Sequence, residues 1–260
     1  MSSNSIDEPS HLSDPLEDAT PAQVEHTSIV ERALRRQAVG RAAAAAPPPV
    51  LAEVGGELGL VLDHSSARSE RIRALRTELL LLSESTREAT MMALVSPSRG
   101  EGRSRLTAEL AMAFSQLGRR TLLIDADLRR PRQHLFFRTD NSSGLTQTLA
   151  TNAPVRHVGV AGLPELRILT SGPAAPNPLE LLSHGRFERM LLAMRREYEY
   201  VLIDTPPVSE FADALIVATL TTRVLVVTRA NITSHAATKG MLRRLASTRT
   251  HVLGAILNHF

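Results

Sequence analysis

A glycine-rich loop and three aspartates give this chain the residue types of phosphoryl-transfer chemistry. The loop reads SPSRGEGRS over residues 96–104, with Gly100 and Gly102 on either side of a glutamate. Glycines allow the backbone to turn tightly enough for its N–H groups to point at phosphate oxygens. We therefore predict a phosphate-binding loop between a strand and a helix, where the positive end of the helix dipole adds to the attraction.

The side chains of this loop fit a phosphate site, with one departure. Arg103 stands where such loops carry the lysine that reaches the β- and γ-phosphates, and Lys239 is the only lysine in the chain. Arginine keeps the positive charge and can bind phosphate through two N–H groups, but it is longer and planar. Ser104 stands where the loop hydroxyl coordinates Mg²⁺, and Arg99 and Arg105 add positive charge.

Three aspartates follow hydrophobic runs that have the composition of strands. Asp125 and Asp127 lie in LLIDADLRRP, and Asp204 lies in VLIDTPP. Ligands of α/β folds bind at the carboxyl ends of the strands, so we expect these carboxylates in the same crevice as the loop. One such aspartate is more often a helix cap, but three beside a glycine-rich loop favour Mg²⁺–nucleotide chemistry and a base for an attacking hydroxyl. Arg129 and Arg130 either stabilise transferred charge, bind a neighbouring subunit or form a solvated surface pair.

The elements that must position these residues alternate along the chain. A helix is predicted from about Ser69, because Leu75, Leu79 and Leu82 recur at helical spacing, and a second helix is predicted over 106–117. Predicted strands are short apolar runs at residues 91–95, 120–125, 200–204, 224–227 and 252–257. Apolar strands that alternate with helices predict an α/β fold with a mostly parallel sheet covered by helices on both faces. The glycine-rich loop makes the expected fold P-loop NTPase-like.

Residues 1–60 differ in composition from the rest of the chain. Acidic residues are interspersed with Ser and Pro, and an alanine run at 42–46 precedes Pro47–Pro49. Such a segment buries little apolar surface, so we predict a disordered or weakly helical tail over 1–60 and one nucleotide-binding domain over 61–260. Residues 29–45 could form a short helix, either transient or used for docking to a partner.

Composition narrows the function classes further. The 260 residues contain no cysteine and carry a formal net charge of +3, so disulfides and thiolate metal sites are excluded, and no direct nucleic-acid partner is expected. No run approaches the roughly 20 apolar residues of a membrane-spanning helix, and no signal peptide is evident. We expect a cytoplasmic protein that can still dock onto a membrane partner.

Together, these segments resemble the bacterial tyrosine kinases that regulate capsular and exopolysaccharide synthesis, which are deviant-Walker P-loop proteins related to the MinD and ParA ATPases. SPSRGEGRS resembles their Walker A motif, LLIDADLRRP their Walker A′ motif and VLIDTPP their Walker B motif. Glu70, Arg73 and Arg76 match their E-x-x-R-x-x-R oligomerisation motif, and ILNHF resembles their I-x-N element. The resemblance covers about residues 68–258.

The resemblance implies an ATP- and Mg²⁺-dependent transfer of a phosphoryl group to protein tyrosine. Asp125 would act as the base toward the tyrosine hydroxyl, and the catalytic residues would be Asp125, Asp127 and Arg103. Mg²⁺, the only metal expected, would be organised by Ser104, Asp127 and Asp204. The nucleotide would be bound by Arg99, Gly100, Glu101, Gly102, Arg103, Ser104, Arg105 and, at the adenine, Asn258.

The resemblance also implies partners. Glu70, Arg73 and Arg76 would join subunits of a homo-oligomer. A separate transmembrane protein that modulates polysaccharide chain length would activate the chain and hold it at the inner face of the cell membrane. The substrate would be another protein.

Two features differ from the family pattern and keep two further hypotheses open. Arg103 replaces the lysine, and the chain ends at Phe260 without the family's tyrosine cluster. Its only tyrosines are Tyr198 and Tyr200, of which we expect the first to be partly exposed and the second to be structural. One alternative is a catalytically impaired, nucleotide-sensing regulatory or scaffold subunit. The other is a MinD- or ParA-like positioning ATPase, although the early lysine of that Walker A loop is absent here.

Overall fold

The computed structural model of the chain describes residues 51–63, 65–83 and 90–259. The strands are β1 (Thr90–Val95), β2 (Thr121–Asp125), β3 (Val158–Val160), β4 (Leu163–Leu169), β5 (Tyr200–Asp204), β6 (Arg223–Arg229) and β7 (His251–Asn258). The 3-10 helix η1 (Gly56–Leu58) precedes α2 (Gly59–Leu62), α3 (Ala67–Ser83), α4 (Arg103–Ser115), α5 (Gln133–Phe136), α6 (Leu145–Thr151), α7 (Pro178–Ser183), α8 (Gly185–Glu197), α9 (Asp213–Thr221) and α10 (His235–Ala246).

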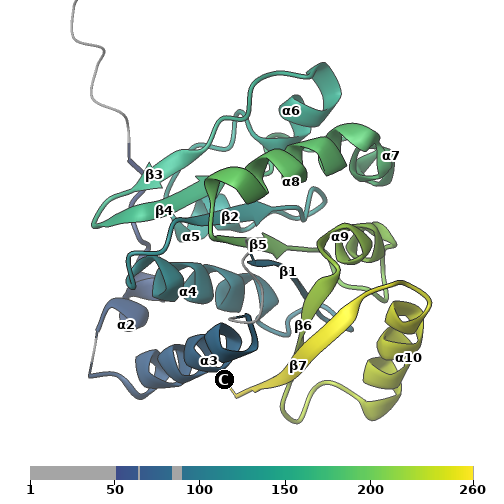
Figure 1. Ribbon diagram of the computed structural model, residues 1–260. Helices are drawn as coiled ribbons and strands as arrows, with labels where there is room; N and C mark the ends of the chain where they lie inside the picture. The colour runs from purple at the N-terminus through teal and green to yellow at the C-terminus, as the bar shows by residue number, and fades with distance from the viewer. Residues whose placement is uncertain (1–50, 64, 84–89, 260) are drawn as a thin grey trace, which may run out of the picture. The chain divides into compact units, whose positions relative to one another are not determined.

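In the described part of the chain, the strands form one seven-stranded sheet in the order β3-β4-β2-β5-β1-β6-β7 (Figure 1). Neighbouring strands pair in parallel except β3, which is antiparallel to β4. The register places Asp125 at the end of β2 directly beside Asp204 at the end of β5. The predicted α/β fold with a mostly parallel, helix-covered sheet is confirmed, and the two aspartates meet at one edge of the sheet.

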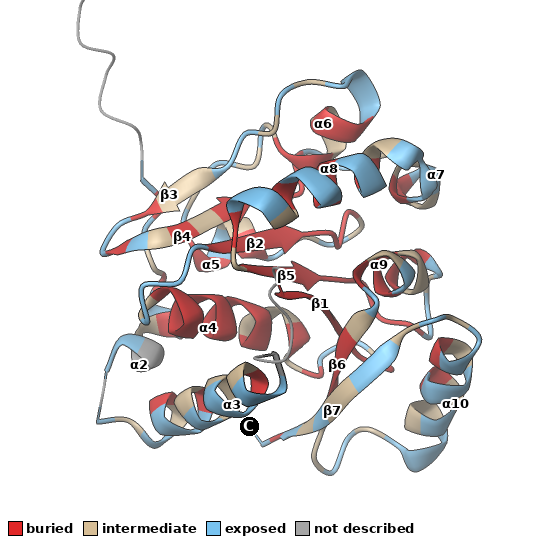
Figure 2. Ribbon diagram, in the orientation of Figure 1, coloured by how far each residue is buried: buried red, intermediate tan, exposed pale blue. Residues whose placement is uncertain are grey.

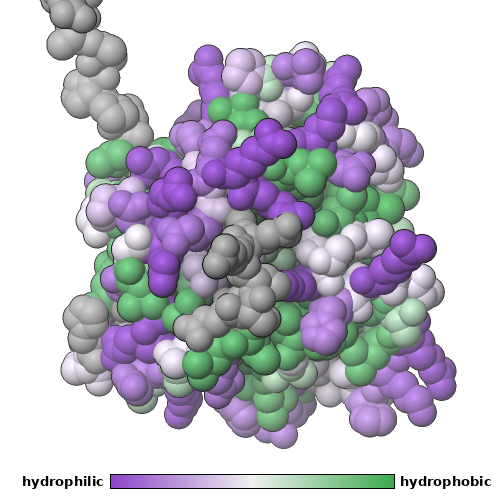
Figure 3. Space-filling view, viewed as in Figure 1, coloured by the Kyte–Doolittle hydropathy of each residue, from purple (hydrophilic) through white to green (hydrophobic). Residues whose placement is uncertain are grey.

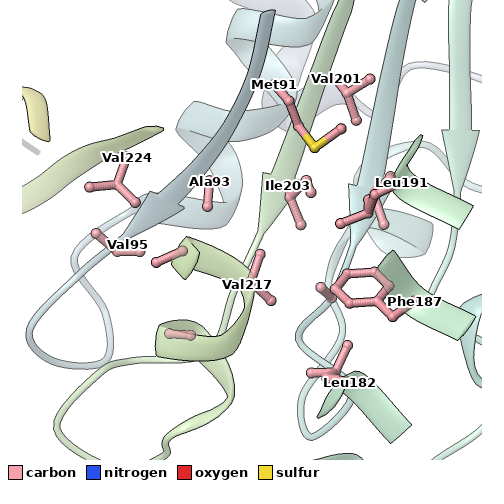
Figure 4. Packing of buried hydrophobic residues seen from close by; sticks show 14 of the residues in the cluster. Met91, Ala93, Val95, Leu182, Phe187, Leu191, Val201, Ile203, Val217 and Val224 are labelled. Carbon is pink, nitrogen blue, oxygen red and sulfur yellow. The ribbon is translucent and has the colours of Figure 1, made fainter. Parts of the chain in front are cut away.

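The central strands are apolar along their whole length because helices cover both of their faces. Side chains alternate between the faces, so Met92 and Leu94 of β1 pack with α4, whereas Met91, Ala93 and Val95 pack on the opposite side. Figure 4 shows that opposite layer, in which Phe187 and Leu191 of α8 and Val217 of α9 contact the sheet. Figure 1 shows α2, α3 and α4 on one face and α7 to α10 on the other.

Helix α4 is buried almost all round, as the red ribbon in Figure 2 shows. The ring of Phe114 near its end stacks on Tyr200 of β5 with 4.1 Å between ring centroids. Glu109 is fully buried, and Arg68 of α3 holds both of its carboxylate oxygens at 2.6 Å while Arg105 donates to one of them at 2.9 Å. Because a buried charge must be paired, this contact fixes α3 against α4.

Helix α8 has one side buried against the sheet and the other exposed to solvent. Phe187, Leu191 and Met194 are buried against the sheet, and Arg196 and Glu197 are exposed. The view in Figure 3 shows hydrophilic residues over this outward face. The helix therefore forms because one stripe of its surface is apolar and the rest is solvated.

The packed part of the chain begins before residue 61. Residues 1–50, with the predicted N-terminal tail and its short helix, lie outside the described residues. From residue 51 the chain packs on the domain: Ala52 and Leu58 are fully buried, and Ala52 bridges to Val160 of β3. Three glycines interrupt the apolar residues of this stretch, which is why composition alone placed its boundary with the domain about ten residues later.

Both tyrosines are buried, each with 8% of its surface exposed. The prediction that Tyr198 is partly exposed is therefore wrong, because this residue packs in the cluster beneath α8, with its ring edge-on to His157. The structural role expected for Tyr200 agrees with its stacking on Phe114. In the described segments, every helix is too short or too polar to span a bilayer.

Candidate functional site

The glycine-rich loop connects β1 to α4, as the sequence predicted. Gly100 and Gly102 adopt φ angles of 78° and 82°, in the left-handed region that side-chain-bearing residues rarely adopt. α4 begins at Arg103 directly after Gly102, and the first backbone hydrogen bond of the helix runs from Leu106 to Gly102. The loop therefore ends at the positive pole of a 13-residue helix.

The loop is held in place from the β6–β7 side. The buried carboxylate of Glu101 accepts a hydrogen bond from Thr233, and the side-chain amide of Asn258 donates to the carbonyl of Glu101 at 3.1 Å. Arg229 donates to the carbonyl of Gly100 at 3.4 Å. Asn258 is thus a buried tether of the loop at the end of β7, and its predicted contact with adenine stays a prediction.

Arg103 is buried at the base of the loop, with 7% of its surface exposed. Its Nε donates to Oδ1 of Asp204 at 3.0 Å, and its Nη1 donates to Oγ of Ser96 at 2.7 Å. Its Nη2 lies 3.4 Å from Oδ2 of Asp127. One guanidinium therefore joins the loop to the ends of β5 and β2.

Gln133 binds the second carboxylate oxygen of Asp204, and the sequence analysis did not identify this residue. Its amide nitrogen donates to Oδ2 of Asp204 and to the carbonyl of Ser104, both at 2.9 Å. Gln133 is fully buried, and its Oε1 has no hydrogen-bond partner. A glutamine shortly after Walker A′ matches no motif, so only the fold reveals this contact.

Asp125 acts as an organiser of the backbone that follows β2. It is fully buried, and its carboxylate accepts hydrogen bonds from the backbone N–H groups of Asp127, Arg132 and Gln133 at 3.0 to 3.2 Å. Burial raises the pKa of this carboxyl well above its usual value, and the neighbouring Asp204 raises it further. In this arrangement Asp125 stabilises the backbone of the segment between β2 and α5 from its buried position.

Asp127 is the carboxylate that reaches the cavity in front of the loop. It is 5% exposed, and its Oδ1 accepts hydrogen bonds from the backbone N–H groups of Arg129 and Arg130. Burial, followed by the charge of Asp204, raises its pKa to about 6, against the opposing effect of Arg103. Asp127 therefore titrates near the pH at which a general base works best.

One cavity of about 630 Å³ opens in front of the loop. Six arginines and four carboxylates line it, together with Leu135, Phe136, Pro207 and Phe211. Arg129 is fixed in its wall, because its guanidinium pairs with Asp213 at 3.0 Å and lies 4.0 Å above the ring of Phe211. The structure thus brings together on this cavity the predicted residues Arg99, Gly100, Glu101, Gly102, Arg103, Ser104, Arg105 and Asp127.

Of the residues expected to hold Mg²⁺, Asp127 and Asp204 are close to one another, but their carboxylate oxygens are engaged. The guanidinium of Arg103 bonds to both Asp127 and Asp204, and Gln133 takes the second oxygen of Asp204. Mg²⁺ requires several oxygens in near-octahedral geometry about 2.1 Å away. Among the described side chains no cluster of three or more His, Asp or Glu is arranged for a metal ion. This arrangement does not fit a divalent cation between Asp127 and Asp204.

The three residues of the predicted oligomerisation motif lie on α3, away from the cavity lining. Glu70 is exposed and accepts a hydrogen bond from Arg73 on the same helix at 2.8 Å. Arg76 turns toward α4 and donates to the carbonyl of Ala113 at 3.1 Å. Arg76 therefore also contributes to the packing of its own subunit.

Taken with the sheet order, the loop and the strand-end aspartates define a P-loop NTPase-like domain. The family model described as cellulose biosynthesis protein BcsQ matches residues 90–254. The chain is 36% identical over 198 residues to the tyrosine-protein kinase YwqD of Bacillus subtilis, a match that covers 75% of this chain and 83% of the relative. The chain belongs to the bacterial tyrosine-protein kinase family of capsule and exopolysaccharide synthesis.

Solved structures agree with this assignment. The chimerical protein CapA2B2 superposes with a TM-score of 0.72 and 29% identity, covering 81% of this chain and 93% of that one. The kinase domain of the Escherichia coli tyrosine kinase ETK gives a TM-score of 0.71 and 27% identity, covering 80% and 88%. The resemblance to this family is therefore confirmed at the level of the whole P-loop domain.

The raised pKa of Asp127 predicts how stability depends on pH. Between about pH 4 and pH 6 the unfolded chain has lost this proton while the folded chain keeps it, so the free energy of unfolding falls as the pH rises from about 4 to about 6 and levels off above that. We expect Asp127→Asn to gain about 2–3 kcal/mol relative to the native protein between pH 4 and pH 7. Denaturant unfolding at a series of pH values measures this gain.

Asp140→Asn is the matched control, because Asp140 is exposed and its pKa is lowered by hydrogen bonds from Ser142. The stability of this variant relative to the native protein should stay constant above pH 5. A constant difference for Asp127→Asn as well would show that its carboxyl titrates normally.

Proposed function

We propose that this chain binds ATP in the cavity at the loop and transfers its γ-phosphoryl group to a tyrosine of another protein. The observation that carries the proposal is the cavity itself, which combines the P-loop, the start of α4, Asp127 and an arginine-rich wall. Its volume of about 630 Å³ lies in the range of small-molecule and cofactor sites. The relatives are named tyrosine-protein kinases, which supports the same activity.

The chemistry assigns a role to each group that faces the cavity. The backbone N–H groups of the loop and the end of α4 bind phosphate oxygens. Asp127 accepts the proton of the tyrosine hydroxyl as the phenolic oxygen bonds to the γ-phosphorus and the bond to the β-phosphate oxygen breaks, which releases ADP. Arg103 stabilises the negative charge that spreads over the transferred group.

This assignment moves the role of the base from Asp125 to Asp127. Asp125 is fully buried and bonded to three backbone N–H groups, whereas Asp127 lines the cavity and has a pKa of about 6. A base must lie within hydrogen-bond reach of the proton that it accepts. Asp125 is then a positioning residue for the backbone that presents Asp127.

The phosphorylated tyrosine belongs to another protein. The chain has two tyrosines, and both are buried. Burial also raises the pKa of Tyr198 to about 12, which makes its hydroxyl a poorer nucleophile.

We propose that the chain has a membrane partner, a transmembrane modulator of polysaccharide chain length. This partner holds the chain at the inner face of the cell membrane and activates it. The activity then regulates polysaccharide chain length or export.

A second function is favoured by the environment of Arg103. Its guanidinium is already bonded to Asp204, Ser96 and Asp127, which leaves it less free than a lysine to follow the phosphates during transfer. The chain would then act as a nucleotide-sensing regulatory or scaffold subunit of the polysaccharide machinery.

Phosphotransfer separates the two functions. The purified protein should transfer ³²P from γ-labelled ATP to a synthetic glutamate–tyrosine copolymer. Asp127→Asn should lower the rate at least about 100-fold, because general base catalysis contributes that much. Asp140→Asn, an exposed aspartate outside the cavity, should keep the native rate.

The outcomes are distinct. Absence of phosphotyrosine with the native protein, together with nucleotide binding, would leave the scaffold function and overturn the kinase proposal. An Asp127→Asn variant as fast as the native protein would overturn the role of Asp127.

Self-association through α3 is the second part of the proposed function. The exposed carboxylate of Glu70 and the half-buried Arg73 form one charged surface on this helix. A second copy could pair with this surface, because Glu70 has most of its side chain in water.

We expect Arg73→Ala with Arg76→Ala to weaken self-association, measured as a smaller sedimentation coefficient at equal concentration. Arg71→Ala is the matched control, since Arg71 is exposed on the same helix outside the motif. Circular dichroism must show that the double variant is folded, because Arg76 also bonds to α4. An unchanged sedimentation profile of a folded double variant would contradict the proposal.

A further inference from the structure

The guanidinium of Arg103 occupies the place between two carboxylates where a cation would neutralise them. Arginine has five N–H donors, and the bonds to Asp204, Ser96 and Asp127 use three of them. The other two belong to the terminal nitrogens Nη1 and Nη2. Because Arg103 also lines the cavity, these two N–H groups remain to donate to a phosphate that enters it.

Side chains of the site already bind and neutralise its buried carboxylates. Asp204 is fully buried and has each oxygen bonded, one to Arg103 and one to Gln133. Asp127 has one oxygen bonded to backbone N–H groups and the other to Arg103. A divalent ion here would have to displace a permanently charged guanidinium from a buried position, at a high electrostatic cost.

The wall of the cavity is suited to a nucleotide that carries its full negative charge. Arginines outnumber carboxylates in the lining by six to four. Arg99 and Arg130 line the cavity and are exposed. Cations of the protein can therefore screen the phosphates that Mg²⁺ screens elsewhere.

We propose that this site binds a nucleoside di- or triphosphate without a divalent cation, with the guanidinium of Arg103 in place of the metal ion. Gln133 supports this arrangement by holding the second oxygen of Asp204. The inference rests on the proposed nucleotide binding and adds that the affinity is independent of Mg²⁺. A lysine at position 103 carries its charge and its three donors on one nitrogen, so it cannot span the two carboxylates as the planar guanidinium does and would leave carboxylate oxygens for a metal ion.

Calorimetric titration of the full chain with ADP tests the proposal, because ADP cannot be turned over. We expect the dissociation constant of ADP in excess EDTA to lie within about threefold of its value in millimolar Mg²⁺. Arg103→Lys should become dependent on Mg²⁺, with an affinity at least about tenfold weaker in EDTA. Arg119→Lys makes the same chemical change at an exposed pair with Glu199 and should keep the native behaviour.

Each outcome decides between the two proposals. If ADP binding by the native protein requires Mg²⁺, this inference is overturned and the proposed function stays intact. Absence of binding under both conditions would overturn both. Because the comparison of EDTA with Mg²⁺ is made on the native protein, a misfolded Arg103→Lys variant would not remove the test.

Discussion

The ion-pair network of Arg103 is the interaction on which the rest of the site depends. Its guanidinium bonds to Ser96 at the start of the loop, to Asp204 at the end of β5 and to Asp127 after β2. These three segments come together only because β1, β2 and β5 are neighbours in the sheet. A charge this deeply buried is stable only with well-placed partners, so the network and the strand order require each other.

The network also separates the roles of the three aspartates. Asp204 anchors the guanidinium, Asp125 organises the backbone after β2, and Asp127 alone reaches the cavity. Their shared burial raises the pKa of Asp125 and Asp127, because each negative charge is close to another in a medium that solvates charge poorly. A change at position 103 therefore alters the site as a whole, which is why replacing lysine by arginine is not a conservative substitution here.

Much of the fold could be predicted from the sequence, and the limits have physical causes. The apolar runs of β1, β2, β5 and β6 are recognisable because both of their faces are buried. β3 and β4 were missed, since Pro164, Glu165 and Arg167 interrupt the apolar pattern near the edge of the sheet. Motif spacing placed the loop and the aspartates together, but the bonds of Gln133 depend on how the chain folds after β2 and no motif encodes them.

A double-mutant cycle tests the central claim most directly. The free energy of unfolding is measured for the native protein, Arg103→Met, Asp204→Asn and the variant with both changes. If the guanidinium is bound to this carboxylate in the folded protein, the two changes should be coupled by at least about 1.5 kcal/mol. Effects that add to within about 0.5 kcal/mol would show that Arg103 and Asp204 do not interact, and would contradict the account.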